Sequence, residues 1–537
     1  MGILSLNEDR PTPSAVYNWR VYTSAAVASF ASCMIGYDSA FIGTTLSLPS
    51  FVAEFNFASY SPSELALVSA NIVSVYQAGA FFGSLFAYVS NWYLGRKKTL
   101  WVFVAVFLLG AGLMLGANGQ RGLGLILAGR VLAGIGVGAC SMTVPIYISE
   151  LAPPAIRGRL VGIYELGWQI GGLVGFWINY GVNTTMAPSH RQWLIPFAVQ
   201  LIPAGLLMIG AFWIKESPRW LFSKDRREEA LANLCWIRNL DANDLYIIEE
   251  VNFIDEDHER YKQEVGAGFW KPFAALKQPK VLYRFFLGGM LFLWQNGSGI
   301  NAINYYSPTV FKSIGITGTN TSFLTTGIFG VVKTAVTFVW LLYLIDNLGR
   351  RRLLMIGSFG GSMCMWFIGS YIKIANVSAN PTGGLSSSGI AAIFFFYLWT
   401  AFYTPSWNGT PWVLNSEMFD QNTRALGQAS AAANNWFWNF IISRFTPQMF
   451  LTMKYGVYFF FASLMLLSSI FVFFLIPETK SVPLEAMDRL WQTRPVRKAN
   501  KIIMEELRAQ DEEFRHNADG VDLKERNKQN VEQKEMA

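Results

Sequence analysis

Charged residues are scarce in this chain. Asp, Glu, Lys and Arg make up 15% of its 537 residues, whereas soluble globular proteins contain about 25%. Hydrophobic residues make up 52%, and the mean hydropathy is +0.29. This composition excludes an ordinary soluble protein and indicates that lipid surrounds most of the chain.

Cysteine and histidine are also rare, which limits the available chemistry. The four cysteines form no CxxC pair, which argues against a disulfide framework, an iron–sulfur site or a zinc site. None of the three histidines falls in a segment expected to cross the membrane. Because no nucleophile–base pair or metal-ligand cluster is recognisable, we expect no enzymatic activity, no metal and no cofactor.

Long apolar runs occupy most of the remaining sequence. A spanning helix needs roughly 20 apolar residues, and runs of this length predict about twelve spans. They lie near residues 21–45, 67–89, 99–117, 122–146, 160–181, 193–214, 283–305, 323–346, 353–375, 389–413, 427–450 and 456–476.

Polar segments divide these runs into two sets. We expect a cytoplasmic N-terminus (1–20), a six-helix half (21–214), a cytoplasmic linker with short amphipathic helices (215–281), a second six-helix half (282–476) and a cytoplasmic tail with a disordered end (477–537). Basic residues crowd into one alternating set of connections, which is the positive-inside pattern. The net charge of +7 is therefore attributed to membrane topology and not to a nucleic-acid partner.

Charged motifs recur in the same order in the two halves. The matched sets are GRKK at 95–98 with GRRR at 349–352, Glu150 and Arg157 with Glu417 and Arg424, and ESPR at 216–219 with PETK at 477–480. Corresponding positions lie 254 to 267 residues apart. Two homologous halves with a site between them are the architecture of a secondary transporter. The simpler alternative is that each motif only anchors a helix end to lipid headgroups.

Seven short motifs also follow one another along nearly the whole chain. They are GYDSAFIG (36–43), RVLAGIGVG with PIYISELAPPAIRG (130–158), ESPRWL (216–221), GINAINYYSP (299–308), DNLGRRR (346–352), PWVLNSEMF (411–419) and PETKSVPLE (477–485). In this order they resemble the sugar porter family of the major facilitator superfamily. The resemblance implies an all-α membrane protein with the major facilitator fold, in which twelve transmembrane helices form two six-helix halves.

Two longer stretches, 164–185 and 286–308, resemble the fungal quinate permeases within that family, which import a cyclic hydroxy acid together with protons. This resemblance implies a secondary active transporter in the plasma membrane that imports quinate, or a related cyclic hydroxy acid, by proton symport. Two alternatives stay open. One is a proton-coupled or facilitative transporter of a neutral hexose, pentose or uronic acid, and the other is a nutrient receptor that moves no solute.

Two opposite charges fall inside expected membrane helices, where a charge is costly unless it is paired. Asp38 lies in the outer third of the first helix, and Arg130 lies well inside the fourth. In proton-coupled sugar porters the matching Asp and Arg face each other. The resemblance therefore implies that Asp38 carries the proton and that Arg130 controls its proton affinity. The alternative is a static buried ion pair.

The resemblance assigns solute recognition mainly to amides and aromatic rings. Amides donate to and accept from hydroxyls, and an indole covers ring carbons, which suits a polyol. For any single amide the alternative is an interhelical hydrogen bond. The candidate residues are Glu165, Gln169, Gln295, Asn296, Asn301, Tyr305, Lys333, Trp412 and Asn435.

Three of these candidates depart from the usual sugar site. Glu165 and Asn296 stand where family members usually have Gln. Lys333 is expected about 15 Å from either end of its helix, too deep to reach the headgroups easily. It either pairs with Glu165 or meets a carboxylate of the solute, for which Arg130 is a second candidate.

The helix-end motifs predict a set of salt bridges that closes the cytoplasmic side. Its members are Arg96, Glu150, Arg157, Glu216, Arg219, Asp346, Arg350, Glu417, Arg424 and Glu478. Trp92 replaces the Asp that usually precedes the first GR, which is expected to weaken the set in the first half. Gly299 is expected to loosen the seventh helix and allow a gate to move. Candidate glycosylation sites on the outer side are Asn183, Asn320 and Asn376.

Overall fold

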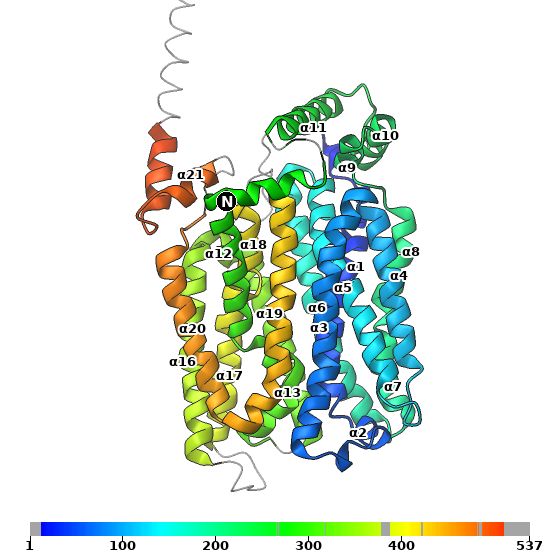
Figure 1. Ribbon diagram of the computed structural model, residues 1–537, viewed down its shortest axis with the longest axis vertical. Coiled ribbons are helices and arrows are strands. Elements are labelled where there is room, and N and C mark those ends of the chain that lie inside the picture. Colours follow the sequence, from blue (N-terminus) through cyan, green and yellow to red (C-terminus); the bar gives the residue numbers. More distant parts are fainter. Residues whose placement is uncertain are drawn as a thin grey trace, which may run out of the picture.

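The computed structural model describes residues 12–264, 266, 268–316, 318–376, 387–419, 423–480, 482 and 486–509. Every regular element in this part of the chain is a helix, and the long helices form an elongated bundle (Figure 1). The end of the tail, for which disorder is predicted, lies outside the described residues.

Within the described residues, six spans come from each half of the chain, as the sequence predicts. The first six are α1 (Trp19–Thr45), α3 (Pro62–Tyr93), α4 (Arg96–Leu115), α5 (Gly124–Leu151), α6 (Arg157–Thr185), and α7 with α8 (His190–Val199 and Leu201–Trp213). The second six are α12 with α13 (Pro279–Gly297 and Ile300–Ile314), α14 with η5 and α15 (Thr319–Val339, Trp340–Leu344 and Ile345–Leu348), α16 (Arg350–Ala375), α17 with η6 and α18 (Ser387–Tyr403, Thr404–Asn408 and Thr410–Met418), α19 (Arg424–Met453) and α20 (Gly456–Leu475).

The outer surface of the bundle is apolar, as a lipid-facing surface must be. Large side chains such as Ile209 and Phe474 are 71% and 56% exposed. By length and hydropathy, nine segments of the described chain qualify as membrane spans, and α6, α12–α13 and α19 do not. These three segments carry polar residues that face the interior, among them Glu165, Asn296 and Asn435, which lowers their hydropathy.

Three of the six spans of the second half are interrupted. The expected span 283–305 is divided at Ser298 and Gly299, and α13 then continues to Ile314. Gly299 has a φ of +90°, which is strained for residues with a side chain, and its predicted role as a helix interruption is confirmed. Two further spans contain the π-helical turns η5 and η6. Such turns shift the register of the side chains that follow them.

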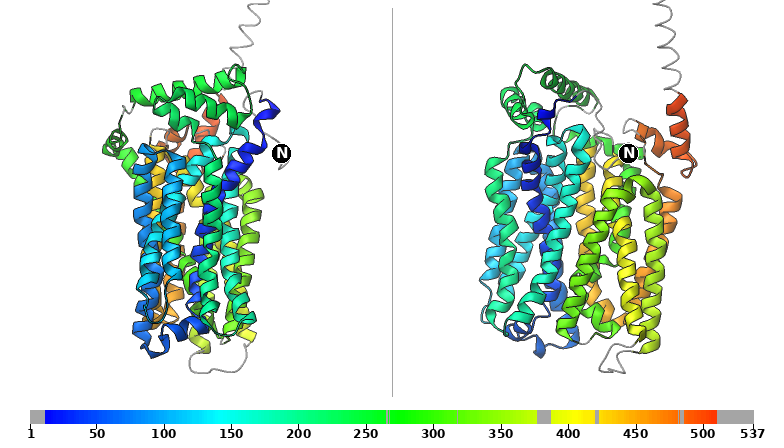
Figure 2. Two further views of the ribbon diagram at one scale, coloured as in Figure 1. Left: turned by 90° about the vertical axis from the view of Figure 1, so that its right-hand side faces the viewer. Right: turned by 180° about the vertical axis from the view of Figure 1, so that it is seen from behind.

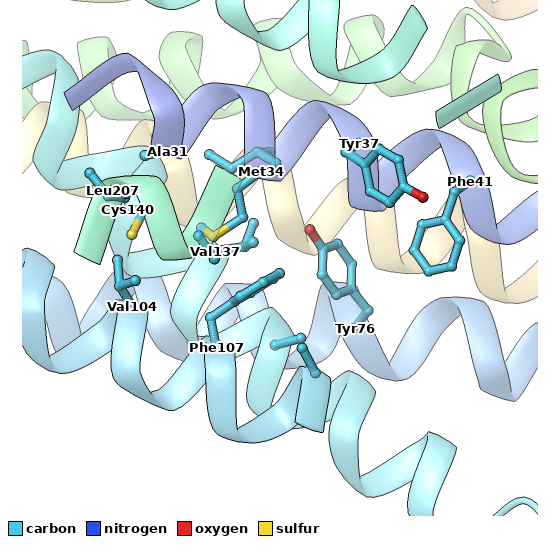
Figure 3. Packing of buried hydrophobic residues seen from close by; sticks show 14 of the residues in the cluster. Ala31, Met34, Tyr37, Phe41, Tyr76, Val104, Phe107, Val137, Cys140 and Leu207 are labelled. Carbon is cyan, nitrogen blue, oxygen red and sulfur yellow. The ribbon is translucent and has the colours of Figure 1, made fainter. Parts of the chain in front are cut away.

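The helices of the first half pack closely through small residues. A Cβ added to Gly138 of α5 would lie 2.0 Å from the carbonyl oxygen of Ala80 in α3, so the two backbones are nearly in contact. Figure 3 shows Met34 of α1 close to Phe107 and Val137 of α4 and α5 in this core. These contacts make α1, α3, α4 and α5 a tightly packed group.

The two halves meet mainly along three helix pairs. These are α1 with α13, α3 with α19, and α6 with α14. The front and rear views place the two halves side by side with their long axes parallel (Figures 1 and 2). The seam between them therefore runs the full length of the bundle.

One end of the bundle carries the connection between the halves, and we call it the linker face. It contains α9 (Pro218–Ser223), α10 (Arg227–Arg238), α11 (Leu245–Glu264) and η4 (Lys271–Lys277) (Figure 1). Arg238 joins α10 to the bundle, because it donates to the carbonyl of Leu151 at 2.7 Å and forms a salt bridge with Glu250 at 2.6 Å. The short helices α2 (Pro49–Glu54) and α21 (Met487–Gln492) lie at the opposite end and beside the linker face, respectively.

The approach of α3 to α5 yields a stability prediction. Gly138→Ala places a methyl group against the Ala80 carbonyl, and no rotamer change relieves a backbone clash. We expect a destabilisation of about 1–3 kcal/mol, measured as a lower melting temperature of the detergent-purified protein. Gly112→Ala in α4 is the matched control, because no atom lies within 4 Å of its added Cβ. Equal melting temperatures for the two variants would contradict the close packing.

Candidate functional site

A buried ion pair joins α1 to α5. Arg130 Nη1 donates to Asp38 Oδ1 at 2.5 Å, and both side chains are 0% exposed. Arg130 Nε donates to the carbonyl of Ile72 at 3.1 Å, and its guanidinium lies 4.4 Å from the centre of the Tyr76 ring. Figure 3 shows the Tyr76 hydroxyl turned toward α1. The two charges that the sequence singles out are therefore in direct contact.

Tyr305 of α13 links this pair to the second half. Its hydroxyl accepts from Asn439 at 3.3 Å, and it donates to Gln77 at 3.2 Å once the Gln77 amide is oriented to satisfy its neighbours. Arg130 exerts an electrostatic effect on Tyr305. Tyr305 was predicted to bind the solute. It instead lies close to the ion pair and hydrogen-bonds to Asn439 and Gln77.

A cavity of about 60 Å³ lies between the halves. On the same scale one water molecule needs about 10–15 Å³, so the cavity has room for a few waters. Two of its lining residues belong to α6 in the first half, and the others belong to the second half. The lining residues are Glu165, Trp168, Gln295, Asn296, Ile300, Asn301, Asn304, Lys333, Tyr403, Asn408, Trp412, Asn435 and Asn439.

Seven of the nine predicted solute residues line this cavity: Glu165, Gln295, Asn296, Asn301, Lys333, Trp412 and Asn435. The other two, Gln169 and Tyr305, do not. Gln169 lies one helical turn beyond Glu165 and donates to its carboxylate at 3.0 Å, so it supports the wall from behind.

Five polar or aromatic lining residues are absent from the sequence prediction. Trp168, Asn304 and Asn439 stand three or four positions after predicted residues, so helical spacing was a usable signal. Tyr403 and Asn408 adjoin or lie in the π turn η6, where that spacing fails. Nothing in the sequence pattern marks these two.

The polar lining residues are hydrogen-bonded in two groups. Asn408 donates to Glu165 Oε1 at 2.7 Å across the seam, and Gln295 donates to the carbonyl of Asn408 at 2.8 Å. Asn301 donates to the amide oxygen of Asn296 over the interruption between α12 and α13. The π turn therefore connects the first half to α12.

Lys333 is the one cation among the lining residues of this cavity in the described chain. Its side chain is 7% exposed, and Glu165 is the charge that acts on it electrostatically. Among the described residues no salt bridge within 4 Å and no hydrogen bond engages the Lys333 ammonium, so the predicted pairing with Glu165 is not a direct contact.

The two halves carry the same arrangement of charges at their linker-face ends. Arg96 donates to both oxygens of Glu150 at 2.7 and 3.0 Å, and Arg350 donates to Glu417 at 3.0 Å. In each half, a Glu that follows the sixth span caps the N-terminus of the third span. Glu216 accepts from the Arg96 amide of α4 at 2.8 Å, and Glu478 accepts from the Arg350 amide of α16 at 2.9 Å. The internal repeat of the sequence is thus a repeat in three dimensions.

Comparisons with known proteins decide the family. The family described as "Sugar (and other) transporter" matches residues 24–491. The chain belongs to the sugar porter family of the major facilitator superfamily.

Individual sugar porters agree with this assignment. The chain is 76% identical over 510 residues to the quinate permease of Neurospora terricola, covering 94% of this chain and 95% of the relative. It is 73% identical over 529 residues, 98% of each chain, to the MFS-type transporter qa-x of Neurospora crassa. The structure of the proton:xylose symporter XylE bound to 6-bromo-6-deoxy-D-glucose superimposes with a TM-score of 0.71 at 26% identity, covering 88% of this chain and 99% of XylE. This sugar porter is therefore a multi-pass membrane transporter and not an enzyme.

The other predicted members of the linker-face salt bridges differ in their surroundings. Arg219 faces Asp257 of α11 at 3.9 Å. Arg157 makes no salt bridge within 4 Å in the described chain, and its buried Nε has no hydrogen-bond partner there. Arg424 is the first residue of α19, and the Asp346 side chain lies outside the described residues.

Trp92 stands where sugar porters usually have an Asp before the first GR motif, and it makes different contacts. The Trp92 ring faces the Lys224 ammonium at 4.3 Å, and its carbonyl accepts from Trp220 at 3.3 Å. Arg96 donates instead to the carbonyl of Asn91 at 3.2 Å. The end of α3 is therefore joined to α9 and to the start of α4 without a carboxylate.

Of the three predicted glycosylation sites, Asn320 and Asn376 are exposed and Asn183 is half-buried. Asn183 and Asn320 lie at the end opposite the linker face and hydrogen-bond to each other across the seam between α6 and α14. Asn376 follows the end of α16.

Glu216 yields a prediction about local stability. Burial raises the pKa of its carboxyl, while the backbone amides of Ser217, Lys97 and Arg96 oppose this shift. Glu216→Ala removes the acceptor for these amides, so the first turn of α4 is expected to open more easily, by about 1–2 kcal/mol. Hydrogen exchange of residues 96–99 should accelerate.

Glu228→Ala is the matched control, because Glu228 is exposed on α10. If the amides at 96–99 exchange equally fast in both variants, the capping role assigned to Glu216 is wrong.

Proposed function

We propose that this sugar porter imports quinate, or a closely related cyclic hydroxy acid, by proton symport through alternating access. The main observation that supports coupling to protons is the contact of Asp38 with Arg130, which is buried between α1 and α5. The naming of a 76% identical relative as a quinate permease, and of XylE as a proton:xylose symporter, supports the solute and the coupling ion.

The ion pair supplies a means of holding and releasing a proton. Asp38 Oδ2 is buried with no hydrogen-bond partner among the described residues, so a proton added there displaces no existing bond. While Arg130 contacts Oδ1, the carboxylate form is favoured, and when the guanidinium withdraws, the protonated form is favoured. Movement of Arg130 relative to Asp38 therefore exchanges the proton.

Tyr305 connects this exchange to the solute. Asn439 lines the cavity and donates a hydrogen bond to the Tyr305 hydroxyl. This hydroxyl donates in turn to Gln77 of α3. The same helix provides Tyr76, whose ring lies beside Arg130. A solute that reorients Asn439 would act through this chain on the packing around the ion pair. Tyr305 follows Gly299, where α13 is free to change direction relative to α12.

The cavity lining suits a small cyclic polyol with a charged group. The side-chain amides offer donors and acceptors for hydroxyls, and Trp412 offers a flat face for ring carbons. Lys333 adds a cation that a neutral sugar does not need. This favours a hydroxy acid over a neutral hexose or pentose.

The orientation in the membrane follows from the basic residues. Arg96, Arg350 and the linker helices all lie at the linker face, which the positive-inside bias assigns to the cytoplasm. Both termini are then cytoplasmic, and the plasma membrane is the location that an importer requires. The paired charges of the linker face close the inner side and separate when the transporter opens inward.

Uptake of labelled quinate, shikimate and glucose by transporter-deficient cells tests the proposal. We expect saturable quinate uptake that an uncoupler reduces severalfold. Asp38→Asn removes the titratable group while preserving its size, so uptake driven by an imposed proton gradient should fall to the level of equilibrative exchange.

The control is Glu256→Gln, a change at an exposed residue of α11 far from the membrane interior, which should leave gradient-driven uptake unchanged. Glucose uptake without quinate uptake would overturn the solute, and quinate uptake that persists with the gradient in Asp38→Asn would overturn the coupling role of Asp38.

A further inference from the structure

The cavity contains an unusual charge arrangement for a sugar site. Glu165 and Lys333 face it from opposite halves, and the other lining residues in the described chain are uncharged at neutral pH. Each is the main charge that acts on the other, yet no salt bridge within 4 Å joins them. The empty cavity is thus close to electrically neutral, with a carboxylate and an ammonium on either side of its interior.

Lys333 is the group best placed to receive an anion. Its ammonium makes no hydrogen bond with the described residues, and its side chain is 7% exposed. A buried ammonium with unused donors gains strongly from a charge-assisted bond to a carboxylate. Arg130, the other candidate, is engaged with Asp38 and Ile72 and does not line the cavity.

An arriving carboxylate changes the charge balance around Glu165. Two carboxylates would then share one ammonium in a site of low polarity, which favours the uptake of one proton by one of them. Gln169 and Asn408 both donate to Glu165 Oε1. Oε2 accepts no hydrogen bond in the described chain, so it is available for the proton.

None of the other titratable groups that face Glu165 can take up the proton in its place. Tyr403 of α17 and Tyr164 of its own helix are phenols that stay neutral near neutral pH, and Lys333 is already protonated. The solute carboxylate, next to a hydroxyl in a hydroxy acid, is more acidic than an alkyl carboxylic acid such as Glu165.

We propose that Lys333 binds the carboxylate of the solute and that Glu165 takes up one proton from water as the solute arrives. The proton comes from a hydronium ion or a buffer acid, whose bond to it breaks as the O–H bond on the Glu165 carboxylate forms, and it returns to the aqueous phase when the solute leaves. The inference rests on the proposed function, because it requires an anionic solute. It implies a solute-linked proton in addition to the one on Asp38.

Isothermal titration calorimetry of the purified protein tests both parts. Quinate is compared with its carboxamide, which keeps the ring and hydroxyls but lacks the charge. The wild type should bind quinate at least about tenfold more tightly than the carboxamide, as expected for one charge-assisted bond. Lys333→Met should abolish this preference without changing carboxamide affinity, and Lys333→Arg should retain part of it.

Titrations in buffers of different ionisation enthalpy count the protons taken up. Quinate binding should take up about one proton more than carboxamide binding in the wild type, and Glu165→Gln should remove this difference. Lys312→Met is the matched control, because it removes an exposed charge from the same half, and it should behave as the wild type.

Each other outcome has a definite meaning. If Lys333→Met weakens the binding of quinate and of its carboxamide equally, or weakens neither, Lys333 does not bind the carboxylate. If the proton difference persists in Glu165→Gln, the proton goes elsewhere. A wild type that binds both ligands equally keeps the proposed function and overturns this inference, whereas a wild type that binds neither overturns both.

Discussion

The contact between Asp38 and Arg130 is the interaction on which the rest of the structure depends. Both side chains are fully buried at a separation of 2.5 Å. Removing two charges from water is costly, and the cost is offset only when the partners stay in good geometry. One turn after Arg130, a Cβ added to Gly134 would lie 2.1 Å from the carbonyl oxygen of Tyr76, so α3 and α5 are packed closely beside the pair. A change in proton binding therefore has to be accompanied by a change in helix packing.

The two halves have different roles around this constraint. The first half packs closely and holds the ion pair, whereas the second half contributes eleven of the thirteen cavity residues, nine of them from interrupted spans. Interrupted helices expose backbone carbonyls and amides to the cavity, as the carbonyl of Asn408 does for Gln295. The rigid half thus suits proton binding, and the deformable half suits solute binding. Tyr305 lies where α13 meets α1, between these two functions.

Much of this arrangement could be predicted from the sequence, for physical reasons. Charges inside apolar runs must be paired, which singled out Asp38 and Arg130. The internal repeat singled out the helix-end charges as a set, without saying that Arg96 pairs with Glu150 and Arg350 with Glu417. The cavity residues Asn408 and Tyr403 could not be predicted, because the π turn η6 breaks the helical period used to find them. Glu216 and Glu478 were expected to form salt bridges with arginine side chains. In the structure they instead accept hydrogen bonds from backbone amides at helix N-termini, and a pattern of residue types does not reveal such bonds. Arg219 turned out to face α11, whose position depends on tertiary packing.

The central claim is that solute and proton move together through this one protein. The most direct test is the purified transporter in proteoliposomes with a pH indicator inside and no imposed proton gradient. An inward quinate gradient should acidify the vesicle interior at a rate that follows quinate entry, and Asp38→Asn should lower the number of protons that enter with each quinate by about one. Quinate entry in the wild type without any movement of protons would contradict the account.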